Sequence, residues 1–316
     1  MSNDRDRPMK LLLATDGSEC ARRALDFLHH FPFPSDSELI LLTVIDKDLY
    51  GSRKSEESLS EEHRESWLKT KEILASDAEK LLETEVDRFG DAGLHWSTRV
   101  CYGQPAEEVL KVSEELDVDL IVMGNHGLGD MKRFLLGSTS DRVMQYAACP
   151  VLIVRPDHTG NTDDTMLLDH PLHILLACDD SRHARYAAEF CASLPMAGET
   201  EVTALSVLPL VTLYRQDVTQ QLEWMWKEKR KVAESGLAWV TENLDWKTPH
   251  LRTLIKEHPD VSEAIVDVAD EFDADMIVIG DKGTGAIKRF LLGSITRRIA
   301  HHAPCSVLVV RQKPGQ

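Results

Sequence analysis

The sequence predicts two tandem copies of one doubly wound α/β domain. Three observations support this fold class. The chain has 316 residues, which is long enough for two ordinary domains. A set of motifs occurs twice in the same order. Within each copy, short apolar runs alternate with longer amphipathic segments, as in a parallel sheet covered by helices on both faces.

The repeat is carried by four pairs of motifs. The first pair lies 163 residues apart (from 16 to 179), and the other three lie 156 residues apart. The pairs are Thr15-Asp16-Gly-Ser18 with Cys178-Asp179-Asp-Ser181, Asp119-Leu-Ile-Val-Met-Gly124 with Asp275-Met-Ile-Val-Ile-Gly280, Lys132-Arg-Phe-Leu-Leu-Gly137-Ser138 with Lys288-Arg-Phe-Leu-Leu-Gly293-Ser294, and Cys149-Pro-Val-Leu-Ile-Val-Arg155 with Cys305-Ser-Val-Leu-Val-Val-Arg311. Such a long period indicates a duplicated domain rather than a solenoid.

The boundary between the copies is predicted at residues 157–171. This stretch is polar, contains Gly160 and lacks an apolar period, which is typical of a linker. We therefore expect a first domain over residues 1–156 and a second over residues 172–316.

Apolar periodicity places the elements of each copy. Residues 11–14, 39–44, 120–123 and 151–154 are short apolar runs that predict buried strands. Helices are expected after Ser18, over about 61–89 and 106–116, and after Ser138. The second copy repeats this order, with a long charged helix over about 220–243.

Composition limits the partners. The chain carries 36 Lys and Arg against 53 Asp and Glu, a formal charge of −17. Such acidity argues against duplex nucleic acid and against anionic membrane surfaces as partners. The six cysteines form no C-x-x-C pair, so we expect free thiols and no zinc site. No apolar leader and no apolar run long enough to span a bilayer are visible, so a cytoplasmic location is expected.

In open parallel sheets, ligands bind beyond the carboxyl ends of the strands, where the strand order switches. The turn after the first strand brings Asp16 and Ser18 there, and Asp179 and Ser181 in the second copy. Two interpretations stay open. The serine can cap the next helix while the aspartate stabilises the turn, or the carboxylate can accept hydrogen bonds from a ribose or an adenine amine.

A glycine-rich loop follows the fourth strand of each copy. Its pattern is Gly-x2-Gly-x9-Gly-Ser, from Gly124 to Ser138 and from Gly280 to Ser294. Glycines let backbone N–H groups approach phosphate oxygens, and a helix that begins at Gly-Ser adds unpaired amides and a positive dipole end. The loop is not a Walker A motif, because Asp130 and Ala286 stand where that motif has lysine. An ordinary glycine-rich connection is the alternative.

Three weaker signals complete the candidate site. A backbone group at Val44 or Val207, at the end of the second strand, can read an adenine edge, although core packing is the simpler interpretation. His126 lies inside the first glycine loop and either touches phosphate or fills the loop. Trp224, Trp226 and Tyr214 form either a partner-docking surface or part of the core.

These motifs resemble the universal stress protein family, in its tandem two-domain form. The family pattern is Gly-x2-Gly-x9-Gly-Ser/Thr after a D-x-I-V-x-G strand, preceded by an early aspartate, and both copies carry it. The resemblance covers residues 9–155 and 172–311. It implies two Rossmann-like domains of the adenine nucleotide alpha hydrolase-like type, each with a five-stranded parallel sheet, that bind ATP with Mg²⁺.

The resemblance also implies site residues. Ribose and adenine would be met by Asp16 and Val44, the sugar by Met123 and Gly124, and the phosphates by Gly127, Gly137, Ser138 and Ser140. The corresponding residues of the second copy are Asp179, Val207, Ile279, Gly280, Gly283, Gly293, Ser294 and Thr296. No catalytic residue and no protein ligand to a metal is expected.

Family members pair through their last strands, so residues 151–154 and 307–310 are expected to join the two copies as an internal pseudo-dimer, which can dimerise again. Two departures make the second site the weaker one. Asp180 replaces Gly17 and adds negative charge near a polyanion, partly offset by Lys282, and the segment before the third helix, around Pro259, is longer by about two residues.

The resulting expectation is an ATP-binding stress-response or regulatory protein with an unidentified protein partner. Two alternatives remain. A slow ATPase or phosphoryl-transfer enzyme would need fixed cations, and Lys132, Arg133, Lys288 and Arg289 are the nearest to the loops. An interaction scaffold that works without nucleotide is the other alternative.

Overall fold

The structure is a computed structural model. It describes residues 7–29, 31–46, 61–90, 94–127, 136–156, 171–196, 199–210, 219–243, 250–283 and 292–313. The predicted linker, 157–171, lies outside these residues except for Pro171, as do Tyr214 and the cations Lys132, Arg133, Lys288 and Arg289.

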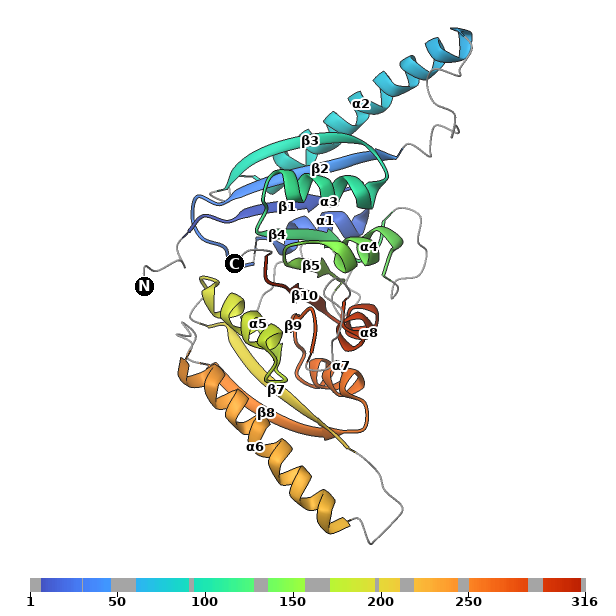
Figure 1. The fold of residues 1–316 in the computed structure, drawn as a ribbon. Coiled ribbons are helices and arrows are strands. Elements are labelled where there is room, and N and C mark those ends of the chain that lie inside the picture. Colours follow the sequence, from blue (N-terminus) through green and yellow to red (C-terminus); the bar gives the residue numbers. More distant parts are fainter. Residues whose placement is uncertain are drawn as a thin grey trace.

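Each half alternates strands and helices as predicted (Figure 1). The first half consists of β1 (Lys10–Ala14), α1 (Glu19–Phe27), β2 (Glu38–Asp46), α2 (Glu61–Phe89), β3 (His95–Gly103), α3 (Pro105–Glu115), β4 (Leu120–Gly124), α4 (Ser138–Tyr146) and β5 (Val151–Val154). The second half consists of β6 (His173–Ala177), α5 (Arg182–Ser193), β7 (Glu201–Pro209), α6 (Thr219–Asn243), β8 (His250–His258), α7 (Val261–Glu271), β9 (Met276–Gly280), α8 (Ser294–His302) and β10 (Ser306–Val310).

The strands form one ten-stranded sheet in the order β3-β2-β1-β4-β5-β10-β9-β6-β7-β8. Within each half all neighbouring strands are parallel. The order turns back between β1 and β4, and between β6 and β9. These two switch points are where a doubly wound sheet offers its ligand crevice.

The two halves meet at the last strands, as expected. Strand β5 pairs with β10 in antiparallel register, with Leu152 opposite Leu308. Both strands are fully buried. This pairing converts two sheets of five strands into one continuous sheet, with β5 and β10 at its centre (Figure 1).

Two apolar layers cover the sheet, and each layer runs across both halves. The first includes Leu25 of α1, Leu82 of α2, Ala187 of α5 and Leu237 of α6. The second includes residues of α3, α4, α7 and α8 on the opposite face. The central strands face both layers, which explains why β1, β4, β5, β9 and β10 are near-continuous apolar runs.

A pair of buried arginines fastens the halves together. Arg155, which follows β5, donates to the carbonyl oxygen of Ala300 in α8 at 2.6 Å. Arg311, which follows β10, donates to the carbonyl oxygens of Met144 at 2.5 Å and of Ala147, at the end of α4. Each cation therefore satisfies carbonyls at the negative end of a helix in the other half.

The edge strands β3 and β8 carry no apolar run, and the apolar pattern did not locate them. Only Cys101 and Gly103 of β3 are buried, because an edge strand has a neighbouring strand on one side only. In the second half, the segment between the third strand and the third helix is longer than in the first half by less than expected. Gln104 alone joins β3 to α3, and Pro259 and Asp260 join β8 to α7, so the difference is one residue rather than about two. Across the described ranges, no helix combines the length and apolarity needed to cross a membrane.

Candidate functional site

The turn after the first strand begins the site. Asp16 accepts a hydrogen bond from the Ser18 amide at its Oδ1 atom, at 3.0 Å, and Ser18 accepts one from the Ala21 amide at 3.2 Å. The serine therefore caps α1, as one of the two interpretations held. In the second half, Ser181 caps α5 through the Ala184 amide in the same way, at 3.1 Å. Both aspartates, Asp16 and Asp179, are exposed beyond the strand ends.

The second carboxylate oxygen of each aspartate faces a glycine of the loop after the fourth strand. A Cβ atom placed on Gly127 would lie 2.4 Å from Asp16 Oδ2, and one placed on Gly283 would lie 2.6 Å from Asp179 Oδ2. A side chain at either position would collide with the carboxylate. The glycines thus let each aspartate carboxylate lie directly against the loop backbone, and both halves share this contact.

The glycine that ends the fourth strand has a different neighbour. A Cβ atom on Gly124 would lie 2.7 Å from the backbone carbon and oxygen of Cys20 in α1. On Gly280 it would lie 2.7 Å from the backbone carbon of His183 in α5. Packing of the first helix against the strand end is therefore enough to require glycine here, and both residues are buried.

The far end of the motif folds back onto the strand end. Gly137 donates to the carbonyl oxygen of Asn125 at 2.7 Å, and Gly293 donates to that of Asp281 at 2.7 Å. Both glycines are helix N-caps without a side chain to bond the first amides of α4 and α8. The next residues, Ser138 and Ser294, are exposed. Each helix thus presents its positive end and a hydroxyl toward the switch point.

The hydroxyl groups of Ser140 and Thr296, two residues further along, form hydrogen bonds inside the protein. Ser140 is 4% exposed and donates to the carbonyl oxygen of Gly124 at 2.9 Å. Thr296 is 2% exposed and donates to that of Gly280 at 2.9 Å. Both side chains therefore hold the helix start against the strand end, and their protons point away from any bound phosphate.

The apolar residues predicted at the site lie in the core. Met123 and Ile279 are buried in the apolar layer beneath α3, α4, α7 and α8, so only their backbone can meet a ligand. Val44 and Val207 are half-buried against the same layer. Neither ends its strand, because β2 continues to Asp46 and β7 to Pro209.

The residues beside the glycine loop differ in charge between the halves. In the first half, Cys20 Sγ lies 3.3 Å from His126 Nε2, and burial raises the pKa of the Cys20 thiol, which keeps it neutral. In the second half, Asp281 is 7% exposed and lies 2.7 Å from His183 Nδ1 and 3.4 Å from Lys282 Nζ. A buried carboxylate is stabilised by a neighbouring lysine and by an imidazole within hydrogen-bond distance.

Sequence reasoning missed the partnership of His183 with Asp281. The repeat offered a signal, since Asp281 stands directly after the strand-end glycine where the first half has Asn125. His183 lies almost a hundred residues away, and no spacing rule links the two. Among the residues that the structure describes, no group of three or more His, Cys, Asp or Glu side chains has the arrangement of a metal site.

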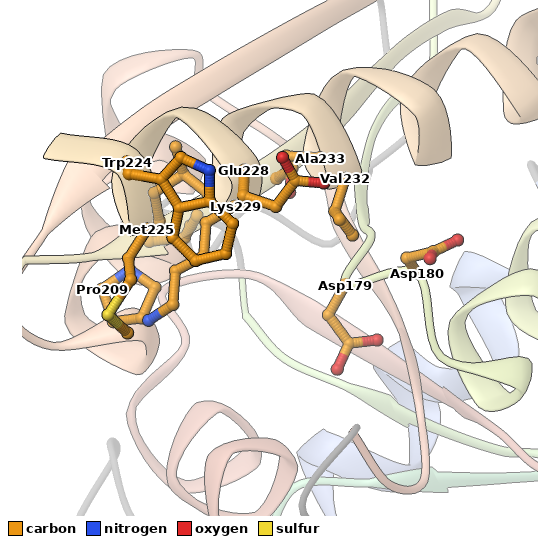
Figure 2. Close-up of a pocket in the computed structure, with 12 residues that line it drawn as sticks. Asp179, Asp180, Pro209, Trp224, Met225, Glu228, Lys229, Val232 and Ala233 are labelled. Atoms are coloured by element: carbon orange, nitrogen blue, oxygen red, sulfur yellow. The ribbon is translucent and has the colours of Figure 1, made fainter. Parts of the chain in front are cut away.

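A cavity of about 490 Å³ opens beside Asp179 in the second half (Figure 2). It lies between the end of β7 and the amino-terminal half of α6. One end is apolar and includes Pro209, Trp224 and Met225, whereas Asp179 and Asp180 lie at the other end (Figure 2). Trp224 is 68% exposed, which excludes a role in the core.

The fold and the repeated loop define a tandem doubly wound α/β protein with one candidate anion site in each half. The family comparison agrees with this architecture. The model of the universal stress protein family matches residues 8–155 and 172–311, and the chain therefore belongs to the universal stress protein family.

Individual relatives match in two ways. Universal stress protein YxiE of Bacillus subtilis is 34% identical over 152 residues, which span 46% of this chain and 98% of the relative. Universal stress protein Rv2005c of Mycobacterium tuberculosis is 26% identical over 247 residues, 76% of each chain. A universal stress protein from Archaeoglobus fulgidus has the same fold over 98% of both chains, with a TM-score of 0.58 and 23% identity.

Proposed function

We propose that this protein binds ATP at two sites, one in each half, and acts as a nucleotide-dependent regulatory protein of the stress response. One observation carries the proposal. In both halves a strand-end carboxylate lies against the backbone of a loop glycine, Gly127 or Gly283, beside a helix start that no side chain caps. An anion and a hydroxyl-bearing sugar, held side by side, match these two features.

The residues of each site divide by chemistry. Backbone amides at Gly127 and Ser138 would bind phosphate oxygens near the positive end of α4. The sequence placed Gly137 there too, but its amide is already bonded to the Asn125 carbonyl, so Gly137 would serve only as the helix N-cap. Asp16 would accept hydrogen bonds from the ribose hydroxyls. The counterparts in the second half are Gly283, Ser294 and Asp179, and the Gly293 amide is likewise bonded to the Asp281 carbonyl. Val44 and Val207 would contact the base through their backbone.

Magnesium fits such a site without a dedicated set of protein ligands. Mg²⁺ keeps several of its waters and is commonly held through the phosphates of a nucleotide. The part of the chain that the structure describes offers no cluster of three carboxylate, imidazole or thiol groups for it. The ion would then arrive with ATP and depend on it.

The test begins with the purified full-length protein. Denaturing it and identifying any released nucleotide by chromatography gives moles of ATP per chain, and calorimetry with ATP and Mg²⁺ counts the remaining sites. About two ATP per chain supports the proposal for both halves. Absence of release together with absence of binding at millimolar ATP contradicts it and favours a scaffold that works without nucleotide.

Single-site variants assign the sites. Gly127→Val forces a side chain into Asp16, and Gly283→Val does the same at Asp179, so each should lower the stoichiometry by one. Asp16→Asn is the finer probe, because its remaining oxygen can still accept from the Ser18 amide. Loss of the charged hydrogen bond corresponds to about 1.5–3 kcal/mol, or roughly tenfold or more in Kd. Turnover of bound ATP, followed by phosphate release, separates a binding protein from a slow ATPase.

A further inference from the structure

The cavity between β7 and α6 extends from Val207, the residue proposed to contact the base, to residues of α6 that the proposed nucleotide roles do not use. Its volume is about 490 Å³. It is lined along α6 by Trp224, Met225 and Val232, and along β7 by residues up to Pro209. Asp179 closes one end, so the cavity is continuous with the second candidate site (Figure 2).

Its apolar wall is unusually open to solvent. Trp224, Met225 and Val232 are 68%, 47% and 46% exposed. The same helix packs in the core through Ala233 and Leu237, and Ala233 also lines the cavity. An exposed tryptophan costs solubility, and an exposed apolar wall that lines a concave site points to a ligand.

The first half does not share this wall. Buried Ala78 and Leu82 of α2 correspond to buried Ala233 and Leu237 of α6, which sets the register between the two helices. In that register Trp224 corresponds to Lys69. Trp224 itself therefore has no aromatic counterpart at the same position of the first half, where Trp67 of α2 and Tyr102 of β3 lie around Lys71 instead.

The position of Asp179 fixes how a nucleotide would enter. Asp179 lies against Gly283, on the side where α8 offers its amides to phosphate. A ribose held at Asp179 then has its phosphates toward Gly283. Its base, attached on the other side of the sugar, would extend along the end of β7, toward the end of the cavity where Figure 2 shows Pro209 and Trp224.

We propose that Trp224 stacks on the base of the nucleotide in the second site. The inference rests on the proposed function and adds a specificity residue to it. Every nucleobase has a π-face, and an aromatic side chain that lies along it contributes strongly to affinity. Glu228 and Lys229, which also line the cavity, offer an acceptor and a donor to the edge of the base. The two halves therefore hold their nucleotides by different base contacts.

The experiment uses the full-length chain with the first site closed by Gly127→Val, so that binding reports the second site. Trp224→Ala in this background should raise the Kd for ATP with Mg²⁺ by roughly tenfold, the size expected when one stacked aromatic is lost. Trp224→Phe should restore most of the affinity. Lys69→Ala, at the corresponding position of α2, is the matched control and should leave the Kd unchanged. Because Trp224 is exposed, thermal melting should confirm that the fold is intact in all variants.

Fluorescence gives an independent readout. Stacking should quench tryptophan emission when ATP is added, and Trp224→Phe should abolish that part of the change. An unchanged Kd in Trp224→Ala with unaltered quenching overturns the inference while leaving nucleotide binding in place. Binding that is lost in Gly127→Val but kept in Gly283→Val also overturns it, because the second half then holds no nucleotide. If the unaltered protein binds none, the proposed function fails first.

Discussion

The two halves of the molecule build the same backbone frame around different charges. Both place a carboxylate against a loop glycine, at 2.4 Å and 2.6 Å from the position of a Cβ atom. Beside that frame, the first half has a neutral Asn125 and the second has Asp281. The extra negative charge is accompanied by His183 and Lys282, which replace Cys20 and His126 of the first half.

A second difference between the halves concerns the size of two facing side chains. Gly17, with φ +76°, lies against Leu81 of α2, and a Cβ atom there would approach Leu81 Cδ1 to 3.0 Å. The second half has Asp180 at this position, also with a positive φ of 58°, and Gly236 takes the place of leucine opposite it. The comparison shows that close backbone approaches are kept, whereas side chains around them change in compensated groups.

The largest expected loss of stability concerns the strand-end glycines, Gly124 and Gly280, which both halves share. Gly124→Ala and Gly280→Ala each bring a methyl group within 2.7 Å of the backbone of the first helix, α1 or α5. Overpacking against rigid backbone should lower the free energy of unfolding by about 3 kcal/mol in both variants, measured by urea titration. Gly236→Ala is the control. Its Cβ would lie 3.4 Å from Asp180 Cβ, and alanine should stabilise α6 by about 0.5–1 kcal/mol.

The next largest effect compares the two arginine contacts that join the halves. Arg311 donates to two carbonyl oxygens of α4, but Arg155 donates to one of α8 among the contacts described. Burial lowers the pKa of both guanidinium groups, yet arginine stays protonated. Arg311→Met should cost about 2 kcal/mol and Arg155→Met about 1 kcal/mol, by the same urea titration. Equal losses would show that the two arginine contacts are energetically symmetric.

The sequence predicted the architecture because buried parallel strands leave a strong trace. Residues 120–123 were expected as a strand and β4 spans Leu120–Gly124, and the pairing of the last strands was expected as well. The edge strand β3 left no such trace. Its residues are mostly polar, because β3 pairs only with β2 and lies at the edge of the sheet.

The candidate site was predictable only in outline. The spacing of Gly127 and Gly137 identified the loop, but not that Gly127 faces Asp16 Oδ2 or that Ser140 is occupied by a strand carbonyl. For Trp224 the sequence left both the core and a docking surface open, and its exposure in the structure decides against the core. Contacts between residues far apart in sequence decide each of these points.

The exchange of size between the halves gives a smaller, sharper test. Gly236→Leu should push against Asp180 and lower the free energy of unfolding by about 1–2 kcal/mol. Adding Asp180→Gly recreates the Gly17 and Leu81 pair of the first half. The double variant should recover about 1 kcal/mol relative to the sum of the single changes. Additive losses would mean that α6 does not approach the turn as closely as α2 does.

The smallest effect concerns the start of the third helix, where the halves differ by one inserted residue. Asp260 caps α7 through the Ser262 hydroxyl and the Ser262 and Glu263 amides, and it pairs with Arg298. Gln104, its counterpart, makes no capping bond to α3.

The Ser262 hydroxyl, the Glu263 amide and Arg298 hold the pKa of the Asp260 carboxyl well below its usual range. A depressed pKa in the folded state adds stability above the unfolded value of about 3.9, and this contribution fades as the pH falls below it. Asp260→Asn keeps an acceptor but removes the charge. Its melting temperature should therefore fall below that of the unaltered chain at about pH 7, and the gap should narrow toward about pH 3. Gln104→Ala should show no such dependence, and a gap that stays constant with pH would assign the cap to hydrogen bonding without charge.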